Sequence, residues 1–239
     1  MTTIIELAGI KVAISFLYKE TYQRFLPFVS TGCPDYRISL TQERFEEESQ
    51  TLCNAYPNIS LTRSDIEFNA LYRDIPVILQ QKEIILLHGV LIEMEGLGYL
   101  FMGPSGVGKT THGKNWLKMF PGKSRIINGD KTLVRIENKF IYGYGSPWMG
   151  KEKIGVNSRV QLHAICHLSR GKNNQIRPVD SNGSFIEWMY AETMLKDREQ
   201  RAIELIRWYK RVSSLIPLFE LECNTLPESA IVSYHGMCK

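Results

Sequence analysis

The segment Gly103-Pro104-Ser105-Gly106-Val107-Gly108-Lys109-Thr110 follows the pattern GxxxxGK(S/T) without a gap. Its three glycines allow successive backbone N–H groups to turn inward on a phosphate chain, which side chains at those positions would obstruct. Lys109 would then place a positive charge on the outer phosphates, and the hydroxyl of Thr110 would bind Mg2+. The residues expected to bind nucleotide are Gly103, Pro104, Ser105, Gly106, Val107, Gly108, Lys109, Thr110 and Thr111.

The sequence on either side of this segment supplies the strand and the helix that a phosphate-binding loop needs. A β-rich run at residues 99–102 precedes it, and a helix-forming run at residues 109–119 follows, with Gly122 as the expected stop. The alternative, a glycine turn that fits the pattern by chance, would not require this context. We therefore predict nucleotide binding.

Short turns upstream of the loop predict the type of sheet. Two apolar strands, residues 83–87 and 90–94, are expected with only His88-Gly89 between them, and a turn at residues 95–98 leads into the next strand. Tight turns force neighbouring strands to run antiparallel. The expected fold class is α/β with α+β character, in which a mixed, largely antiparallel sheet surrounds the loop and its helix.

The chain is expected to have a smaller N-terminal part and a larger core. Residues 1–80 should form a β-rich segment packed on the core, and residues 81–239 the core itself with the C-terminal helices. Ser64 and Glu67 have the spacing of a capping box. The helix that they would open is expected to kink or end at Pro76.

Composition indicates an ordinary globular protein, with 44% apolar and 23% charged residues. The sequence has no apolar run of about 18 residues and no basic start of a signal peptide, so we expect a cytoplasmic location and no membrane partner. A net charge of +4 is too small to indicate nucleic acid. The five cysteines lack CxxC spacing, which argues against a disulfide framework and against a zinc site.

Asp130 is the candidate for the second half of a metal site. It follows the apolar run at residues 125–128, directly after Gly129. At the end of a buried strand its carboxylate could meet the Mg2+ held by Thr110. The alternative is an ordinary aspartate in a turn.

Several of these segments together resemble a known family. Residues 87–92, 96–98 and 103–110 are similar to the core of bacterial HPr kinase/phosphorylase, whose nucleotide fold is shared with phosphoenolpyruvate carboxykinase. The likeness continues through residues 127–131, whereas residues 144–148 look more like HPr-kinase-related proteins of anaerobic bacteria. The resemblance implies a phosphotransferase that uses ATP and Mg2+, with a sheet of the phosphoenolpyruvate carboxykinase/HPr kinase C-terminal domain type.

The resemblance also implies roles for single residues. The family's active-site histidine matches His88, near the transferred phosphoryl group. The family has two adjacent aspartates, the first of which takes the acceptor's proton, and this chain has Gly129 there and keeps only Asp130. The proton acceptor is therefore open between His88 and Asp130, and the expected catalytic residues are Lys109, His88 and Asp130. The family's arginine-glycine signature loop is not recognisable, so the HPr protein is not assumed to be the acceptor.

A loop rich in Gly, Pro and Lys, residues 143–158, is a second candidate for function. Its length and composition differ from those of a plain connector, and it could close over the nucleotide or the acceptor. The alternative is a solvated charged loop. The substrate-loop candidates are Trp148, Lys151, Glu152, Lys153 and Asn157, together with Arg170.

These observations favour a kinase that moves the γ-phosphoryl group of ATP to a hydroxyl, on a serine of a protein or peptide or on a small molecule. A non-catalytic nucleotide-binding partner of a regulatory or peptide-modification system is the alternative that Gly129 favours. A phosphatase or phosphorylase is a third. The sequence leaves the acceptor and the oligomeric state open, a homo-oligomer included.

Overall fold

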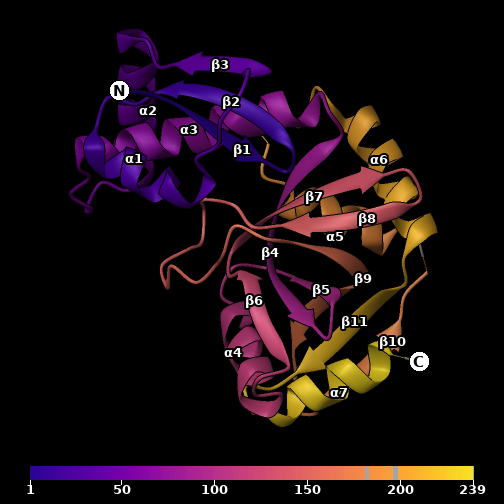
Figure 1. The fold of residues 1–239 in the computed structure, drawn as a ribbon. Coiled ribbons are helices and arrows are strands. Elements are labelled where there is room, and N and C mark those ends of the chain that lie inside the picture. Colours follow the sequence, from indigo (N-terminus) through magenta and orange to yellow (C-terminus); the bar gives the residue numbers. More distant parts are fainter. Residues whose placement is uncertain (181–182, 196–198, 239) are drawn as a thin grey trace. The chain divides into compact units, whose positions relative to one another are not determined.

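The computed structural model describes residues 1–180, 183–195 and 199–238. The chain forms two compact units, Met1–Lys82 and Glu83–Lys239, and each is described by itself (Figure 1).

The first unit is a three-stranded sheet with helices. Strands β1 (Thr2–Leu7) and β2 (Ile10–Ser15) form an antiparallel hairpin, and β3 (Tyr36–Ser39) runs parallel to β2. The turn between β1 and β2 uses Ala8 and Gly9, both with positive φ. The helices are α1 (Lys19–Phe25), the short 3-10 helix η1 (Leu26–Phe28), α2 (Gln42–Ala55) and α3 (Arg63–Gln80).

Helix α3 begins and ends elsewhere than its sequence indicates. Its capping box is formed by Thr62 and Asp65, so the expected box at Ser64 and Glu67 is wrong. The carboxylate of Glu67 instead accepts hydrogen bonds from the backbone of residues 17 and 18, at 2.6 and 3.1 Å. The helix also continues through Pro76, whose lost backbone hydrogen bond is outweighed by the buried apolar face on either side of it.

The second unit is built on an eight-stranded sheet with the order β10-β11-β9-β5-β4-β7-β8, in which β6 also pairs with β4. The strands are β4 (Ile84–Met94), β5 (Leu97–Met102), β6 (Ser124–Asn128), β7 (Lys131–Glu137), β8 (Phe140–Tyr144), β9 (Arg159–Arg170), β10 (Gln175–Pro178) and β11 (Leu218–Cys223). The helices are α4 (Lys109–Met119), α5 (Ser184–Glu192), α6 (Ala202–Leu215) and α7 (Glu228–Met237).

The fold is mixed α/β and its sheet is mixed, as expected. Strand β4 is antiparallel to β5, β6 and β7, whereas β5, β9 and β11 are parallel to one another. Because parallel strands end at the same edge of a sheet, the carboxyl ends of β5, β9 and β11 lie together. The loop at residues 103–108 leaves β5 at this edge.

Strand β4 corrects the expectation of two strands separated by a turn. His88 and Gly89 lie inside one continuous strand. A Cβ on Gly89 would lie 2.9 Å from the Leu100 side chain, so glycine is needed here for lack of room, and no turn is present. The first half of β4 pairs with β7 and the second half with β6, which places the β6–β7 connection opposite His88 and Gly89.

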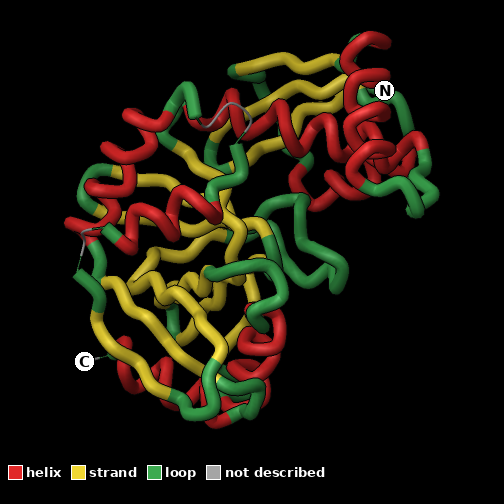
Figure 2. The backbone as a smooth tube through the Cα atoms, turned by 180° about the vertical axis from the view of Figure 1, so that it is seen from behind, coloured by secondary structure: helices red, strands yellow, loops and turns green. Residues whose placement is uncertain are grey.

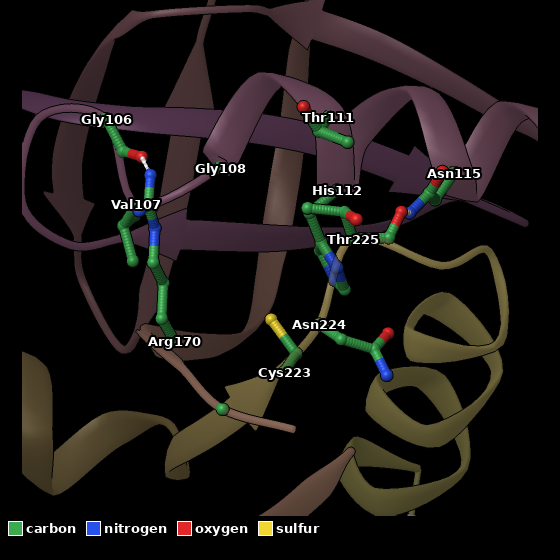
Figure 3. A pocket seen from close by; sticks show the side chains of 11 residues that line it. Gly106, Val107, Gly108, Thr111, His112, Asn115, Arg170, Cys223, Asn224 and Thr225 are labelled. Carbon is green, nitrogen blue, oxygen red and sulfur yellow. Dashed lines mark hydrogen bonds between the residues drawn. The ribbon is translucent and has the colours of Figure 1, made fainter. Parts of the chain in front are cut away.

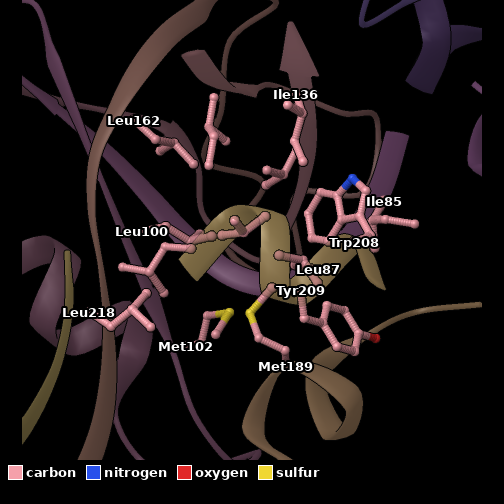
Figure 4. Packing of buried hydrophobic residues seen from close by; sticks show 14 of the residues in the cluster. Ile85, Leu87, Leu100, Met102, Ile136, Leu162, Met189, Trp208, Tyr209 and Leu218 are labelled. Atoms are coloured by element: carbon pink, nitrogen blue, oxygen red, sulfur yellow. The ribbon is translucent and has the colours of Figure 1, made fainter. Parts of the chain in front are cut away.

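The sheet is covered on both faces, and its strands alternate their side chains between two cores. One core joins the sheet to α5 and α6, and Figure 4 shows part of it, with Leu87 and Met102 of the sheet beside Met189 and Tyr209 of the helices. The other core packs residues such as Val90 and Phe101 against α4 and α7. Figure 2 shows these strands between the helices. Within the described ranges no helix is both long and apolar enough to cross a membrane.

Candidate functional site

The loop between β5 and α4 has a backbone that only glycine adopts easily. Gly103, Gly106 and Gly108 have φ values of 141°, 78° and 116°. Gly103 is also confined, because a Cβ there would lie 2.7 Å from the carbonyl oxygen of Leu168. Helix α4 begins at Lys109, as expected, and among the described residues no side chain caps it. Its first N–H groups therefore remain available to an anion.

Lys109 is held against this loop. The residue is only 6% exposed, and its Nζ donates hydrogen bonds to the carbonyl oxygens of Gly103 (2.5 Å) and Pro104 (3.2 Å). Burial lowers the pKa of Lys109, against the attraction of the Glu192 and Asp130 carboxylates. The ammonium group thus lies in the field of two acidic side chains that belong to other elements.

A pocket of about 470 Å3 opens beside the loop (Figure 3). It is bounded by the loop and by the carboxyl ends of β9 and β11, which is where open α/β sheets bind ligands. Arg170 reaches along one wall, and its Nη2 donates a 2.5 Å hydrogen bond to the carbonyl oxygen of Gly106. The lining residues are Gly106, Val107, Gly108, Thr111, His112, Asn115, Arg170, Gly171, Cys223, Asn224 and Thr225.

Buried hydrogen bonds fix the pocket wall formed by α4. The ring of His112 lies between the hydroxyls of Ser229 and Ser233, each 3.2 Å away, and Trp116 Nε1 donates to His112 Nε2 at 3.1 Å. Burial lowers the pKa of His112 to about 3. The ring is therefore neutral, and it joins α4 to α7 behind the pocket.

His88 lies between two carboxylates. Its Nε2 is 3.2 Å from Oδ1 of Asp130, and its Nδ1 is 2.8 Å from Oε2 of Glu192. The strand pairing explains the first contact, since His88 faces Lys131 across β4 and β7, and the backbone N–H of Gly89 donates to the carbonyl oxygen of Asp130 at 2.8 Å. The structure thus brings the expected residues His88 and Asp130 together and adds Glu192.

Asp130 carries a charge that its neighbours stabilise. Burial would raise the pKa of Asp130, but the hydrogen bond from His88 and the positive charge of Lys131, whose Nζ is 3.1 Å away, hold it below its ordinary value. The neighbouring Gly150 has φ 74°, and a Cβ there would lie 2.8 Å from Cβ of Asp130. Glycine at position 150 therefore lets the loop backbone pack closely against this ionised carboxylate.

The position of the missing aspartate is filled by backbone from the long loop. Gly129 N–H donates to the carbonyl oxygen of Ile154 at 2.9 Å, and a Cβ on Gly129 would lie 3.0 Å from that oxygen. Asn128 shapes the turn, because its Oδ1 accepts hydrogen bonds from the backbone of Asp130 and Lys131. An aspartate at position 129 would therefore press against the backbone of this loop.

The substrate-loop candidates lie in different surroundings. Trp148 is 4% exposed, and its carbonyl oxygen accepts from the Lys131 backbone at 3.2 Å, so this part of the loop is packed on β7. Glu152 is exposed and forms a 3.0 Å ion pair with Lys114 of α4. The same loop also carries the exposed side chains of Lys151, Lys153 and Asn157. Arg170 instead lines the pocket.

Two further residues at the site have no motif that could reveal them. Glu192 closes a helix that is otherwise largely apolar, and only its burial distinguishes it. His167 on β9 stacks on Trp188, with ring centroids 4.1 Å apart, and its buried Nδ1 has no hydrogen-bond partner among the described residues. Burial lowers the pKa of His167, against the charges of Glu220 and Glu192.

The described residues contain no group of three or more His, Cys, Asp or Glu side chains that could hold a metal ion by themselves. Mg2+ at phosphate sites is usually held by one or two protein oxygens together with the phosphates. The ionised Asp130 is a carboxylate ligand of the kind that such binding uses.

Comparison with known proteins adds one distant likeness. No protein-family model matches the chain, and no curated protein matches it. Among solved structures, the chain is similar to the HPr(Ser) kinase/phosphatase from Coxiella burnetii over 63% of this chain and 95% of that chain, with 12% sequence identity and a TM-score of 0.36. At this distance the likeness lends no support to a function, which has to come from the residues of the site.

Proposed function

We propose that this protein is an ATP-dependent and Mg2+-dependent kinase that transfers the γ-phosphoryl group to a hydroxyl acceptor. One observation carries the proposal. The glycine loop leads directly into the uncapped start of α4 at Lys109, and the Asp130 carboxylate is close enough to stabilise the positive charge of Lys109. The family relation expected from the sequence, to HPr kinase/phosphorylase and its carboxykinase-type fold, is part of the same proposal.

The triphosphate would lie on the loop. Backbone N–H groups of residues 103–111 would bind the phosphates, and Lys109 would exchange its bonds to the loop carbonyls for bonds to the outer phosphates. The nucleoside would then occupy the 470 Å3 pocket at the ends of β9 and β11. A cavity of this size is large enough for a base and its ribose.

Thr110 and Asp130 would hold the Mg2+, which when bound neutralises charge on the phosphates. The acceptor hydroxyl would approach from the side of His88 and Asp130. Its proton would pass to the Asp130 carboxylate, or to His88 Nε2 when that nitrogen carries no hydrogen; Nε2 lies 3.2 Å from Oδ1 of Asp130. A loose phosphoryl-transfer transition state demands little of this base, so a single carboxylate can suffice.

The acceptor would be a serine of a protein or peptide, or a small molecule. Lys151 and Lys153, with Glu152 and Asn157, would meet it from the exposed part of the loop, because a lysine there can stabilise the migrating charge. Trp148 would serve as the buried anchor of that loop, and Arg170 would contact the nucleotide from the pocket wall.

Replacing Lys109 by Ala tests this function. Transfer of γ-label from ATP to a panel of hydroxyl acceptors should fall at least about 100-fold, because the migrating charge loses its cation. Lys118→Ala, an exposed change on the same helix, is the matched control and should leave transfer unchanged. A Lys109→Ala protein that folds and still transfers label would refute the scheme.

A second candidate is a nucleotide-binding partner protein without catalysis. The packing of loop backbone against Gly129 favours it, because a Cβ at the position of the family's proton acceptor would lie 3.0 Å from the Ile154 carbonyl oxygen. Its signature would be tight binding of ATP and Mg2+ by the wild-type protein while all label stays on ATP.

A further inference from the structure

Glu192 is a buried acid whose position is fixed by its surroundings. Its side chain is 7% exposed. Directly after it the chain pairs with β4: Thr193 forms a bridge with Leu87, and the backbone N–H of Met194 donates to the carbonyl oxygen of Leu86 at 2.8 Å. These contacts hold the end of α5 beside the strand that carries His88.

Further hydrogen bonds of Thr193 hold the end of α5 in place. The Thr193 hydroxyl donates to the carbonyl oxygen of Met189 at 2.8 Å and lies 2.7 Å from the Tyr209 hydroxyl on α6. Both hydroxyls are buried. The carboxylate of Glu192 therefore meets His88 from a rigid part of the fold, since the backbone on both sides of the contact belongs to regular structure.

The contact decides which way the His88 ring faces. A carboxylate 2.8 Å from Nδ1 accepts a hydrogen bond, so Nδ1 carries a hydrogen and Nε2 points to Asp130. A buried carboxylate is costly unless it is paired. Glu192 has this partner, and the ammonium group of Lys109 adds a favourable charge.

We propose that Glu192 is a positioning residue for phosphoryl transfer: it holds His88 so that Nε2 faces Asp130 and the acceptor. This inference rests on the proposed kinase function. In this proposal Glu192 acts through His88, and a direct effect of its charge on Lys109 is the alternative that the test has to separate.

A double-mutant cycle tests that dependence. Glu192→Ala should lower kcat about 100-fold and Glu192→Gln, whose amide oxygen can still accept from Nδ1, about tenfold, with KM for ATP within about twofold of wild type. In a His88→Ala background neither change should lower kcat further. Glu187→Gln, an exposed change on the same helix, is the control and should have no effect. A Glu192 effect of equal size in the His88→Ala background overturns the proposal.

Nitrogen-15 NMR of the histidine rings gives a readout that does not need activity. In the wild-type protein without nucleotide, His88 Nδ1 should show the signal of a hydrogen-bonded N–H, which should be lost in Glu192→Ala and kept in Glu192→Gln. An unchanged His88 signal in Glu192→Ala overturns the positioning role. A wild-type protein that binds ATP but transfers no label refutes the kinase function instead, while the NMR result still decides whether Glu192 orients the ring.

Discussion

At the scale of single residues, two glycines shape the surroundings of Asp130. A Cβ on Gly150 would lie 2.8 Å from Cβ of Asp130, and Gly129 lets the loop backbone approach closely enough to accept its N–H. Each would be overpacked by a single added carbon atom. The Asp130 carboxylate and the long loop therefore depend on each other's geometry.

Gly129→Ala should lower the free energy of unfolding by about 1–3 kcal/mol, because the added Cβ meets the Ile154 carbonyl oxygen. Gly129→Asp, which restores the aspartate of the resembling family, should lower phosphoryl transfer further, since the loop must move. Denaturant titration and label transfer measure the two effects. Gly122→Ala is the control: it strains the turn after α4, where Gly122 has a positive φ, and so lowers stability without changing the surroundings of Asp130. Faster transfer by Gly129→Asp would contradict this account.

At the scale of elements, α4 and α7 are joined by a polar contact inside an apolar core. His112 is the centre of that contact, with the Ser229 hydroxyl at its Nδ1 and both the Ser233 hydroxyl and Trp116 Nε1 at its Nε2. The Trp116 N–H donates both to His112 Nε2 and to the Ser233 hydroxyl, and burial disfavours a positive charge on the ring. Protonation of His112 at low pH should therefore break the contact between α4 and α7.

The pH dependence of stability should show the protonation of the His112 ring. The folded pKa of His112 is about 3 against an ordinary value of 6.5, so the unfolded chain binds the proton more readily. The contribution of the neutral His112 ring to the free energy of unfolding is fully present above pH 6.5. It is lost as the pH falls towards 3, at about 1.4 kcal/mol per pH unit between these two values. His112→Gln should remove this slope from denaturant titrations, and His235→Gln, at an exposed position, should not. Equal slopes in all three proteins would show that the ring is not buried neutral.

At the scale of the whole molecule, every residue assigned to the site belongs to the second unit, Glu83–Lys239. The first unit has a core of its own around Phe45, Leu52 and Ile66. It also holds the buried Glu48 between Arg44 and Arg73, at 3.0 and 2.8 Å. Neither the loop nor the pocket takes a residue from it.

A fragment of residues 83–239 should consequently fold and bind ATP with Mg2+ within about threefold of the intact chain's affinity, because a unit with its own core can fold alone. Thermal melting followed by circular dichroism and calorimetric titration measure this. The matched fragment 1–82 should melt cooperatively and bind no nucleotide. Loss of binding by a folded 83–239 fragment would show that the first unit contributes to the site.

Local sequence signals predicted much of the second unit and part of the site. The helix at Lys109–Met119 is confirmed to the residue, because the loop chemistry before it defines its start. His88-Gly89 was misjudged as a turn, since a glycine required by the Leu100 side chain looks the same in sequence as a turn glycine. Glu192 could not be predicted, because its contact with His88 depends on how α5 returns to β4.

The central claim is that one loop and one carboxylate hold a nucleoside triphosphate and its metal. A crystal structure with a non-hydrolysable ATP analogue and Mg2+ tests it most directly. We expect the triphosphate on the N–H groups of residues 103–111, Mg2+ between Thr110 and Asp130, and the nucleoside in the pocket beside Arg170. An analogue bound elsewhere, with Lys109 still donating to Gly103 and Pro104, would contradict the account.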